Sequence, residues 1–262
     1  MYTYASATLN VMINAARKAG RLLVRDFNEL SKLTITPKSA KSFVTSADIR
    51  SEKMLIADLQ SYRGDYNMLS EEREFQKGES SNITWIIDPL DGTVNFMSGI
   101  PFFCIAIALR RGKDITHGVI YDPMLDIIFY AEKGCGAYMN NTRLRVSSKT
   151  LVPEGMIAMD HHYYVENYQH LKDHVHYIRH LGSASLSLAY VASGKLDAFI
   201  GHGLEIWDRA AGIIMIKEAG GQIDDLEKKQ HPLEAPTILA GNTGSFKKFR
   251  ELLTPTKESL NA

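Results

Sequence analysis

Two aspartates three residues apart, Asp88 and Asp91, follow a short apolar run that is typical of a buried strand. Carboxylates at this spacing on a strand tip can bind hard divalent cations together, and the carbonyl oxygen of Leu90 is placed to add a ligand. Gly92 and Thr93 follow and are expected to open a helix or a turn, whose free backbone N–H groups favour a phosphate oxygen. The pattern therefore indicates a metal and a phosphate at one locus.

The same spacing has a purely structural interpretation, an Asx-type turn in which both aspartates cap backbone N–H groups. Two further acidic positions favour the metal site. Glu71 follows another apolar run upstream, and Asp208 opens an apolar helix near the other end of the chain. Taken alone, Asp208 would be the N-cap of that helix. Clustered carboxylates raise one another's pKa unless cations lie among them, so the set predicts bound cations.

Alternating helices and strands are expected to position these side chains. The apolar spacing predicts a helix over 7–28, and Thr45 or Ser46 as N-cap predicts a second that ends near 62–64. The predicted strands of the first part are 67–70, 84–87, 103–109, 116–121 and 127–131, the last three as an antiparallel meander. Beyond residue 153 we predict strands at 156–159, 198–200, 222–225 and 237–240, and helices at 164–175, 183–193, 208–219 and 245–253.

The change of pattern predicts a soft domain boundary within residues 140–155. We expect residues 1–145 to form an N-terminal α+β part with an antiparallel sheet and most of the metal ligands. Residues 146–262 would form an α/β part that contributes Asp208 and the segment that selects the substrate.

The composition is that of an ordinary soluble enzyme. Of the 262 residues, 45% are hydrophobic, and 30 basic side chains balance 30 acidic ones, so no net charge recruits nucleic acid. The N-terminus lacks a basic stretch followed by an apolar core, and no run approaches the roughly 20 apolar residues of a spanning helix, so a cytoplasmic location is expected. Cys104 and Cys135 lie in strand-like stretches and are expected to be buried, reduced thiols.

Four ordered motifs resemble those of the inositol monophosphatase family, within the magnesium-dependent, lithium-sensitive phosphatases, and the agreement extends over nearly the whole chain. The stretch Phe-Val-Thr-Ser-Ala-Asp at 43–48 is similar to the family's VTxxD segment, and 88–96 and 206–212 resemble its paired signatures. The turn at 182–184 resembles the one that flanks the phosphate. Ser70 stands where the family often has glycine.

The resemblance implies a layered α/β/α/β/α sandwich of the inositol monophosphatase and fructose-1,6-bisphosphatase type, with the site at the junction of its two parts. Glu71 and Thr93, with Asp48 behind them, would hold and deprotonate the attacking water. Two or three Mg²⁺ ions are implied, with ligands from Glu71, Asp88, the Leu90 carbonyl, Asp91 and Asp208. The implied substrate contacts are Asp91, Gly92, Thr93, Gly182, Ser183, Ala184 and Asp208.

One departure from the pattern leaves the alcohol of the substrate open. Family members that hydrolyse inositol phosphates usually have a glutamate seven residues before the last metal aspartate, where this chain has Gly201. The glycine-rich stretch around it could present His202 or Glu205 to a substrate, or serve as a flexible connection. The resemblance implies a small phosphate monoester, with myo-inositol monophosphate first. Histidinol phosphate, fructose 1,6-bisphosphate and 3'-phosphoadenosine 5'-phosphate are the alternatives.

Two other interpretations concern metal and protein partners. Six histidines between 161 and 180 could bind zinc, but no cysteine accompanies them, and their irregular spacing favours solvated side chains. A bacterial relative in the same family is a regulatory partner of the transcription and ribosome-assembly machinery, so a protein partner is the second functional hypothesis. The sequence shows no basic tract for RNA. The resemblance also implies a homodimer and no membrane partner.

Overall fold

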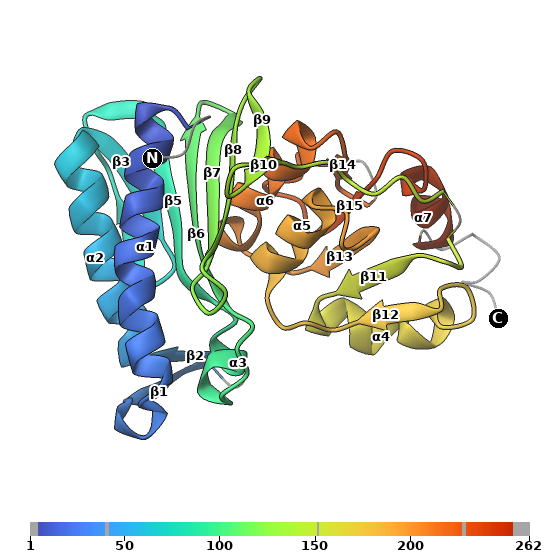
Figure 1. The fold of residues 1–262 in the computed structure, drawn as a ribbon, viewed down its shortest axis with the longest axis horizontal. Helices are drawn as coiled ribbons and strands as arrows, with labels where there is room; N and C mark the ends of the chain where they lie inside the picture. The colour runs from blue at the N-terminus through green and yellow to red at the C-terminus, as the bar shows by residue number, and fades with distance from the viewer. Residues whose placement is uncertain (1–4, 40–41, 151, 227–228, 254–262) are drawn as a thin grey trace.

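The structure is a computed structural model that describes residues 5–39, 42–150, 152–226 and 229–253. Figure 1 shows two large sheets with helices on both faces of each. The first part of the chain contains α1 (Ala7–Phe27), the 3-10 turn η1 (Leu30–Lys32), β1 (Ile35–Ser39), β2 (Ser42–Thr45), α2 (Ser46–Arg63), β3 (Tyr66–Ser70), β4 (Arg73–Gln76), β5 (Ser80–Asp91), α3 (Thr93–Met97), β6 (Cys104–Arg111), β7 (Asp114–Asp122), β8 (Ile127–Glu132), β9 (Gly136–Met139) and β10 (Thr142–Arg143). The second part contains β11 (Met156–Met159), α4 (His161–Leu171), β12 (Tyr177–Arg179), α5 (Ala184–Ala192), β13 (Ala198–His202), α6 (Ile206–Glu218), β14 (Gln222–Asp224), β15 (Thr237–Gly241) and α7 (Phe246–Leu253).

Helices and sheets alternate in layers, which confirms the predicted fold class. Helices α1 and α2 cover one face of an eight-stranded sheet, and α5 and α6 lie between that sheet and a five-stranded one. Helices α4 and α7 cover the far face of the second sheet. Buried apolar side chains on both faces of both sheets hold the layers together, in three clusters. One lies between the first sheet and α1 and α2, one extends from the first sheet through α5 and α6 to the second sheet, and one lies between the second sheet and α4 and α7.

The first sheet brings the predicted acidic strand tips to one edge. Its strand order is β10-β9-β8-β7-β6-β5-β3-β4, and β3 and β5 are parallel neighbours. Met68 pairs with Trp85 and Ser70 with Ile87, so the two strands end at nearly the same level. The residues that follow β3 and those that end β5 therefore meet at the same edge.

The second sheet has the order β12-β11-β13-β15-β14, in which β11 runs parallel to both β12 and β13. The chain leaves β12 to enter α5 and leaves β13 to enter α6. Both helices thus begin at the carboxyl edge of the parallel strands, where open α/β sheets place their sites. Figure 1 shows α5 and α6 packed side by side between the two sheets.

The helices and strands predicted from the sequence are present, with most ends displaced by one to four residues. The predicted helix 164–175 is wrong at both ends, since α4 covers His161–Leu171. It starts early because Asp160 Oδ1 accepts a hydrogen bond from Tyr163 N at 2.7 Å and caps the first turn. It ends at Leu171, and the N–H groups of His174 and Val175 both donate to the Leu171 carbonyl in the turn that follows.

Short elements without an apolar alternation were not predicted, namely β1, β2, β4, β9, β10 and β12. All four residues of β4 are exposed, so no burial pattern could reveal this strand. The prediction for Cys104 is confirmed, because it is buried at the start of β6, but that for Cys135 is wrong. Cys135 is exposed in the turn between β8 and β9, where Gly134 and Gly136 both have positive φ.

Within the described part of the chain, no helix is both long enough and apolar enough to cross a bilayer. The division into two domains at residues 145 and 146 stays a prediction.

Candidate active site

Asp88 and Asp91 lie at the end of β5, where its pairing with β6 is irregular. Asp88 pairs with Ala106 and Asp91 with Cys104, so β5 carries one more residue than β6 between these pairs. Asp88 Oδ1 accepts a hydrogen bond from Leu90 N at 3.0 Å, as the turn interpretation expects. Both aspartates are buried, at 1% and 9% exposure. A buried pair of carboxylates needs more than one turn bond to offset its desolvation, so the turn alone does not explain the motif.

Gly92 and Thr93 form the turn into α3, as the sequence predicted. Gly92 has φ +98°, and a Cβ there would lie 3.0 Å from the Phe102 carbonyl oxygen, so glycine is required twice over. Thr93 Oγ1 donates to the Leu90 carbonyl at 3.1 Å and lies 3.4 Å from Asp48 Oδ1. The hydroxyl thus stands between the turn of β5 and the start of α2.

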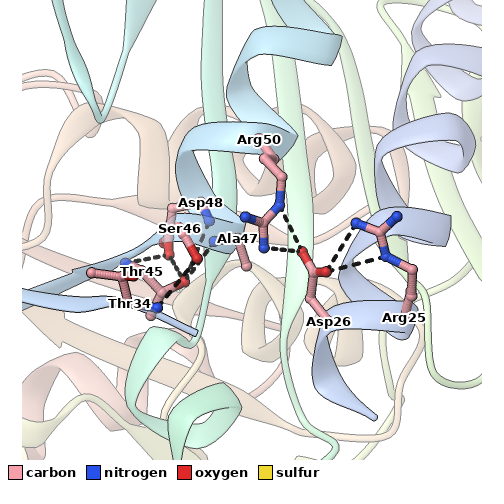
Figure 2. A network of polar contacts seen from close by, with 8 residues as sticks. All are labelled: Arg25, Asp26, Thr34, Thr45, Ser46, Ala47, Asp48 and Arg50. Carbon is pink, nitrogen blue, oxygen red and sulfur yellow. Dashed lines mark hydrogen bonds and ion pairs between the residues drawn. The ribbon is translucent and has the colours of Figure 1, made fainter. Parts of the chain in front are cut away.

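Asp48 is held by the first turn of α2 (Figure 2). Its Oδ2 accepts hydrogen bonds from Thr45 N at 2.8 Å and from Thr45 Oγ1 at 2.5 Å, while Thr45 Oγ1 caps the helix through Ala47 N. Burial raises the pKa of Asp48 to about 6, the bonds from Thr45 oppose this, and the charge of Glu71 adds to it. Asp48 therefore reaches the site with a fixed orientation and a pKa near neutrality.

An ion-pair network anchors the helix that carries Asp48. Figure 2 shows Asp26, near the end of α1, between Arg25 and Arg50. Arg50 Nε and Nη2 donate to Asp26 Oδ2 at 3.1 and 2.7 Å, and Asp26 is buried while Arg50 is half-buried. This paired contact ties the N-terminal end of α2 to α1.

Glu71 follows β3 and sits at the same edge as the end of β5. Its backbone N–H donates to the Ile87 carbonyl at 3.3 Å. Ser70, just before it, and Arg73, two residues after it, bind a buried carboxylate: Ser70 Oγ donates to Glu52 Oε1 at 2.5 Å and Arg73 Nε to Glu52 Oε2 at 2.9 Å. Glu52 is 1% exposed, so the hydroxyl of Ser70 supplies one of the hydrogen-bond partners that this buried carboxylate needs.

Asp208 lies in the first turn of α6, but the prediction that it is the N-cap is wrong. The N-cap is Glu205, whose backbone N–H donates to Asp208 Oδ2 at 2.7 Å. The helix starts earlier than predicted because this carboxylate reaches back to the preceding turn from the third helical position. Arg209 is buried and binds the carbonyls of Pro232 and Ala235, which anchors the same turn.

The turn at Gly182, Ser183 and Ala184 meets Asp91 directly. Ser183 is the N-cap of α5, and its Oγ donates to Asp91 Oδ2 at 2.6 Å. Asn95 Nδ2 donates to the carbonyls of Phe102 and Leu181, both at 2.8 Å, so this amide holds the chain after α3 and the segment before α5 together. Contact of these residues with a substrate stays a prediction.

Four carboxylates that are distant in the sequence act on one another here. Burial raises the pKa of Asp88 well above its ordinary value, and the charges of Glu71, Asp91 and Asp208 raise it further. Burial likewise raises the pKa of Asp208, followed by the charge of Asp91. The pKa of Asp91 rises to about 6, mainly through burial, with the bonds from Ser183 and Ser185 opposing the rise. The structure thus assembles the four side chains that the sequence singled out.

The donor set suits a hard divalent cation. Within the described residues, no three His, Cys, Asp or Glu side chains already have the close geometry of a metal cage. The four carboxylates nevertheless repel one another in a buried place, and oxygen-binding cations such as Mg²⁺ remove that repulsion. Since all the side-chain donors are hard oxygens, they fit Mg²⁺ rather than a thiolate- or imidazole-binding metal.

The histidine-rich region gives no support to the zinc alternative. His161, His174, His176 and His180 are exposed, and the described side chains contain no metal-binding group of three. The side chains of His162 and His170 lie outside the described set. His202 is partly exposed at the end of β13, its backbone N–H donating to Asp160 Oδ2 at 2.8 Å.

Apolar side chains occupy the space where a side chain at position 201 would begin. A Cβ at this buried position would lie 2.5 Å from Leu204 Cδ1 and 3.3 Å from Phe199 Cε1. A glutamate therefore fits here only if Leu204 moves. Glu205 is exposed as the N-cap of α6.

Two hollows lie away from the carboxylates. One is lined by Ile115 of β7, Ile213 of α6 and His231, and the other, of about 480 Å³, by Pro153, His174 and Lys248. Neither is lined by Glu71, Asp88, Asp91 or Asp208.

Comparison with known proteins decides the family. A family model described as the inositol monophosphatase family matches residues 5–260. The chain belongs to this family. It is 43% identical to the inositol-1-monophosphatase of Mesorhizobium japonicum, over 98% of both chains. It is 37% identical to the Nus factor SuhB of Pseudomonas aeruginosa, over 94% of this chain and 96% of that protein.

A solved structure confirms the fold. The extragenic suppressor protein suhB from Bartonella henselae superposes with a TM-score of 0.92 at 42% identity, covering 95% of this chain and 99% of that one. With family and fold shown, the chain is a phosphatase.

The raised pKa values predict how magnesium acts on stability. Asp48 and Asp91 have a pKa of about 6 in the folded protein, above their ordinary 3.8. The fold thus favours their protonated forms, and this contribution to stability is complete below pH ~4 and lost as the pH rises through 6. Mg²⁺ should therefore stabilise the protein more at pH 8 than at pH 5, raising Tm at pH 8 by about 5 °C at 100 times its Kd.

Thermal denaturation of the metal-free protein with and without Mg²⁺, at both pH values, measures this difference. An equal gain at the two pH values, or a larger one at pH 5, would show that the carboxylates do not share a cation.

Proposed function

We propose that the chain hydrolyses a small phosphate monoester by attack of water at a magnesium site. The observation that carries the proposal is the meeting of Glu71, Asp88, Asp91 and Asp208 at one strand edge, where each raises the pKa of a neighbour. The Leu90 carbonyl lies in the same turn and would complete the ligand set. We expect two or three ions, as the family resemblance implies.

The chain's own residues would bind the phosphate and manage the proton of the water. Gly92 is the N-cap of α3 and Thr93 its first residue, and a phosphate oxygen would accept hydrogen bonds from the N–H groups of this first turn. Thr93 Oγ1 can donate one hydrogen bond and accept another, so it would orient the water. Glu71, with Asp48 behind it, would take the proton, and a pKa of about 6 suits Asp48 to share it near neutral pH.

Bound Mg²⁺ supplies positive charge for the oxygens on which charge develops as the ester bond breaks. No side chain has to be phosphorylated in this scheme. Burial and mutual repulsion raise the pKa of these carboxylates, and bound Mg²⁺ would favour their ionised forms.

The first substrate we propose is myo-inositol monophosphate. The 43% identity to an inositol-1-monophosphatase over nearly the full length supports it. Gly201 packs against Leu204 and leaves no room for the usual glutamate unless Leu204 moves, which supports a way of binding the alcohol that differs from that of inositol-specific family members. Histidinol phosphate, fructose 1,6-bisphosphate and 3'-phosphoadenosine 5'-phosphate therefore stay as alternatives. We further propose a homodimer, on the strength of the family resemblance, and two-domain subunits in the cytoplasm, on the strength of the sequence pattern.

Release of inorganic phosphate from a panel of these esters tests the proposal. We expect hydrolysis of at least one ester with Mg²⁺ and a loss of activity with chelator, restored when Mg²⁺ is added back. The matched control is Asp88→Asn, which keeps the side chain's size and removes a charged ligand. It should lower turnover by several powers of ten while the fold, followed by circular dichroism, stays intact. Hydrolysis that continues without divalent ions would refute the mechanism.

A regulatory role through a protein partner is the second proposal. It is supported by the 37% identity to a relative named Nus factor SuhB. The two roles separate in the Asp91→Asn variant, which removes a charged ligand at a buried position. If the role is purely catalytic, the variant should not complement a deletion of the gene, and cells that carry it should behave like cells that carry an empty vector. Complementation by an inactive Asp91→Asn protein would favour the binding role instead.

A further inference from the structure

The first turn of α5 grips the carboxylate of Asp91. Asp91 Oδ2 accepts from Ser183 Oγ at 2.6 Å and from Ser185 N at 2.7 Å, and Oδ1 accepts from Ala184 N at 3.4 Å. Ser183 is 4% exposed and Ser185 0%, so water does not compete for these bonds. The unpaired N–H groups and the dipole of the helix N-terminus both favour a carboxylate at this place.

The same turn also holds the other half of the site. Ser185 Oγ donates to the backbone carbonyl of Asp208 at 2.8 Å. One buried residue thus binds Asp91 of β5 through its N–H group and Asp208 of α6 through its hydroxyl. The spacing between these two acidic residues, which belong to different layers of the fold, is set by α5.

The hydroxyl of Ser183 has no proton left for a substrate. It has one O–H, which it donates to Asp91, and its oxygen accepts from Leu186 N at 3.3 Å as the N-cap of α5. The resemblance implied that this turn contacts the substrate. The hydrogen bonds indicate instead that the side chain of Ser183 orients Asp91, a proposed metal ligand.

The position of this turn is fixed from outside as well. Gly182 has φ +77°, and a Cβ there would lie 2.8 Å from Asn95 Nδ2. Asn95 in turn binds the Leu181 carbonyl at 2.8 Å, so the start of α5 is attached to α3, next to the turn that carries Asp91. The hydrogen bonds from the first turn of α5 to Asp91 are therefore preorganised by the surrounding structure and do not depend on one side chain alone.

We propose that Ser183 and Ser185 are positioning residues that hold Asp91 and Asp208 at the spacing a divalent cation requires, and thereby set the affinity of the site for magnesium. This inference rests on the proposed function, since it assumes that both aspartates bind metal. Groups that orient metal ligands typically change metal affinity 10- to 100-fold when removed.

Binding of Mn²⁺ to the full-length, chelator-treated protein tests the inference without any substrate. Mn²⁺ takes the same oxygen ligands as Mg²⁺, and its free concentration can be followed by electron paramagnetic resonance. We expect Ser183→Ala to bind Mn²⁺ about 10- to 100-fold more weakly and Ser183→Thr, which keeps the hydroxyl, to restore most of the affinity. At saturating Mg²⁺, KM for the substrate should change little.

Ser187→Ala is the matched control. Ser187 lies one turn further along α5, is 2% exposed, and its hydroxyl donates to the Ser183 carbonyl within the helix at 2.6 Å. It should keep the wild-type affinity for Mn²⁺. If Ser183→Ala does not fold, Ser185→Ala serves as the second variant, because it loses the bond to Asp208 and keeps the N–H bond to Asp91. It should bind Mn²⁺ several-fold more weakly.

The outcomes separate the inference from the function on which it rests. If the wild type binds no Mn²⁺, the proposed function fails. If the wild type binds and the Ser183 and Ser185 variants bind equally well, the inference is wrong and the function stands. A raised KM with unchanged Mn²⁺ affinity in Ser183→Ala would assign the serine to the substrate, and it overturns the inference too.

Discussion

The repulsion among four neighbouring carboxylates, two of them buried and two half-buried, is the constraint on which the rest of this structure depends. Glu71 follows β3, Asp88 and Asp91 end β5, and Asp208 lies in α6. Burial together with the charges of neighbouring carboxylates raises the pKa of Asp88, Asp91 and Asp208. A protein that needs only a stable fold gains nothing from such a cluster, because each ion loses its hydration. Positive charge among the carboxylates would offset their repulsion, which makes the cluster suited to binding cations.

Much of the surrounding structure serves to hold these groups in place against their repulsion. Parallel pairing of β3 with β5 brings two acidic ends to one edge, and the layer of α5 and α6 carries Asp208 up to them. The capping box of α2 fixes Asp48, and the first turn of α5 fixes Asp91. Each anchor is a short, buried hydrogen bond at a helix N-terminus, where the backbone offers N–H groups that no other element supplies. The site is thus built from helix starts and strand ends, and apolar packing keeps them in register.

The sequence predicted the local parts of this arrangement well and the long-range parts poorly. Asp88 and Asp91 could be predicted as a site because the strand, the turn and the glycine lie within one short stretch of sequence. Thr45 could be predicted as an N-cap because the cap and the helix it begins are also adjacent in sequence. The N-cap of α6 could not, because glutamate is an unusual cap and the bond from Glu205 N to Asp208 shows only in three dimensions. The contacts of Ser183 and Ser185 with Asp91 join residues more than 90 positions apart, which no local pattern encodes. Cys135 was misread as a buried strand residue although two glycines flank it, a turn signal that its apolar neighbours obscured.

Anomalous diffraction from crystals grown with Mn²⁺ tests the central claim most directly, because it locates the cations without relying on activity. The account predicts strong peaks within about 2.5 Å of the carboxylate oxygens of Asp88, Asp91 and Glu71, with a further peak shared by Asp91 and Asp208. Peaks confined to other places, such as the exposed histidines near α4, or no peak at all beside these carboxylates, would contradict it.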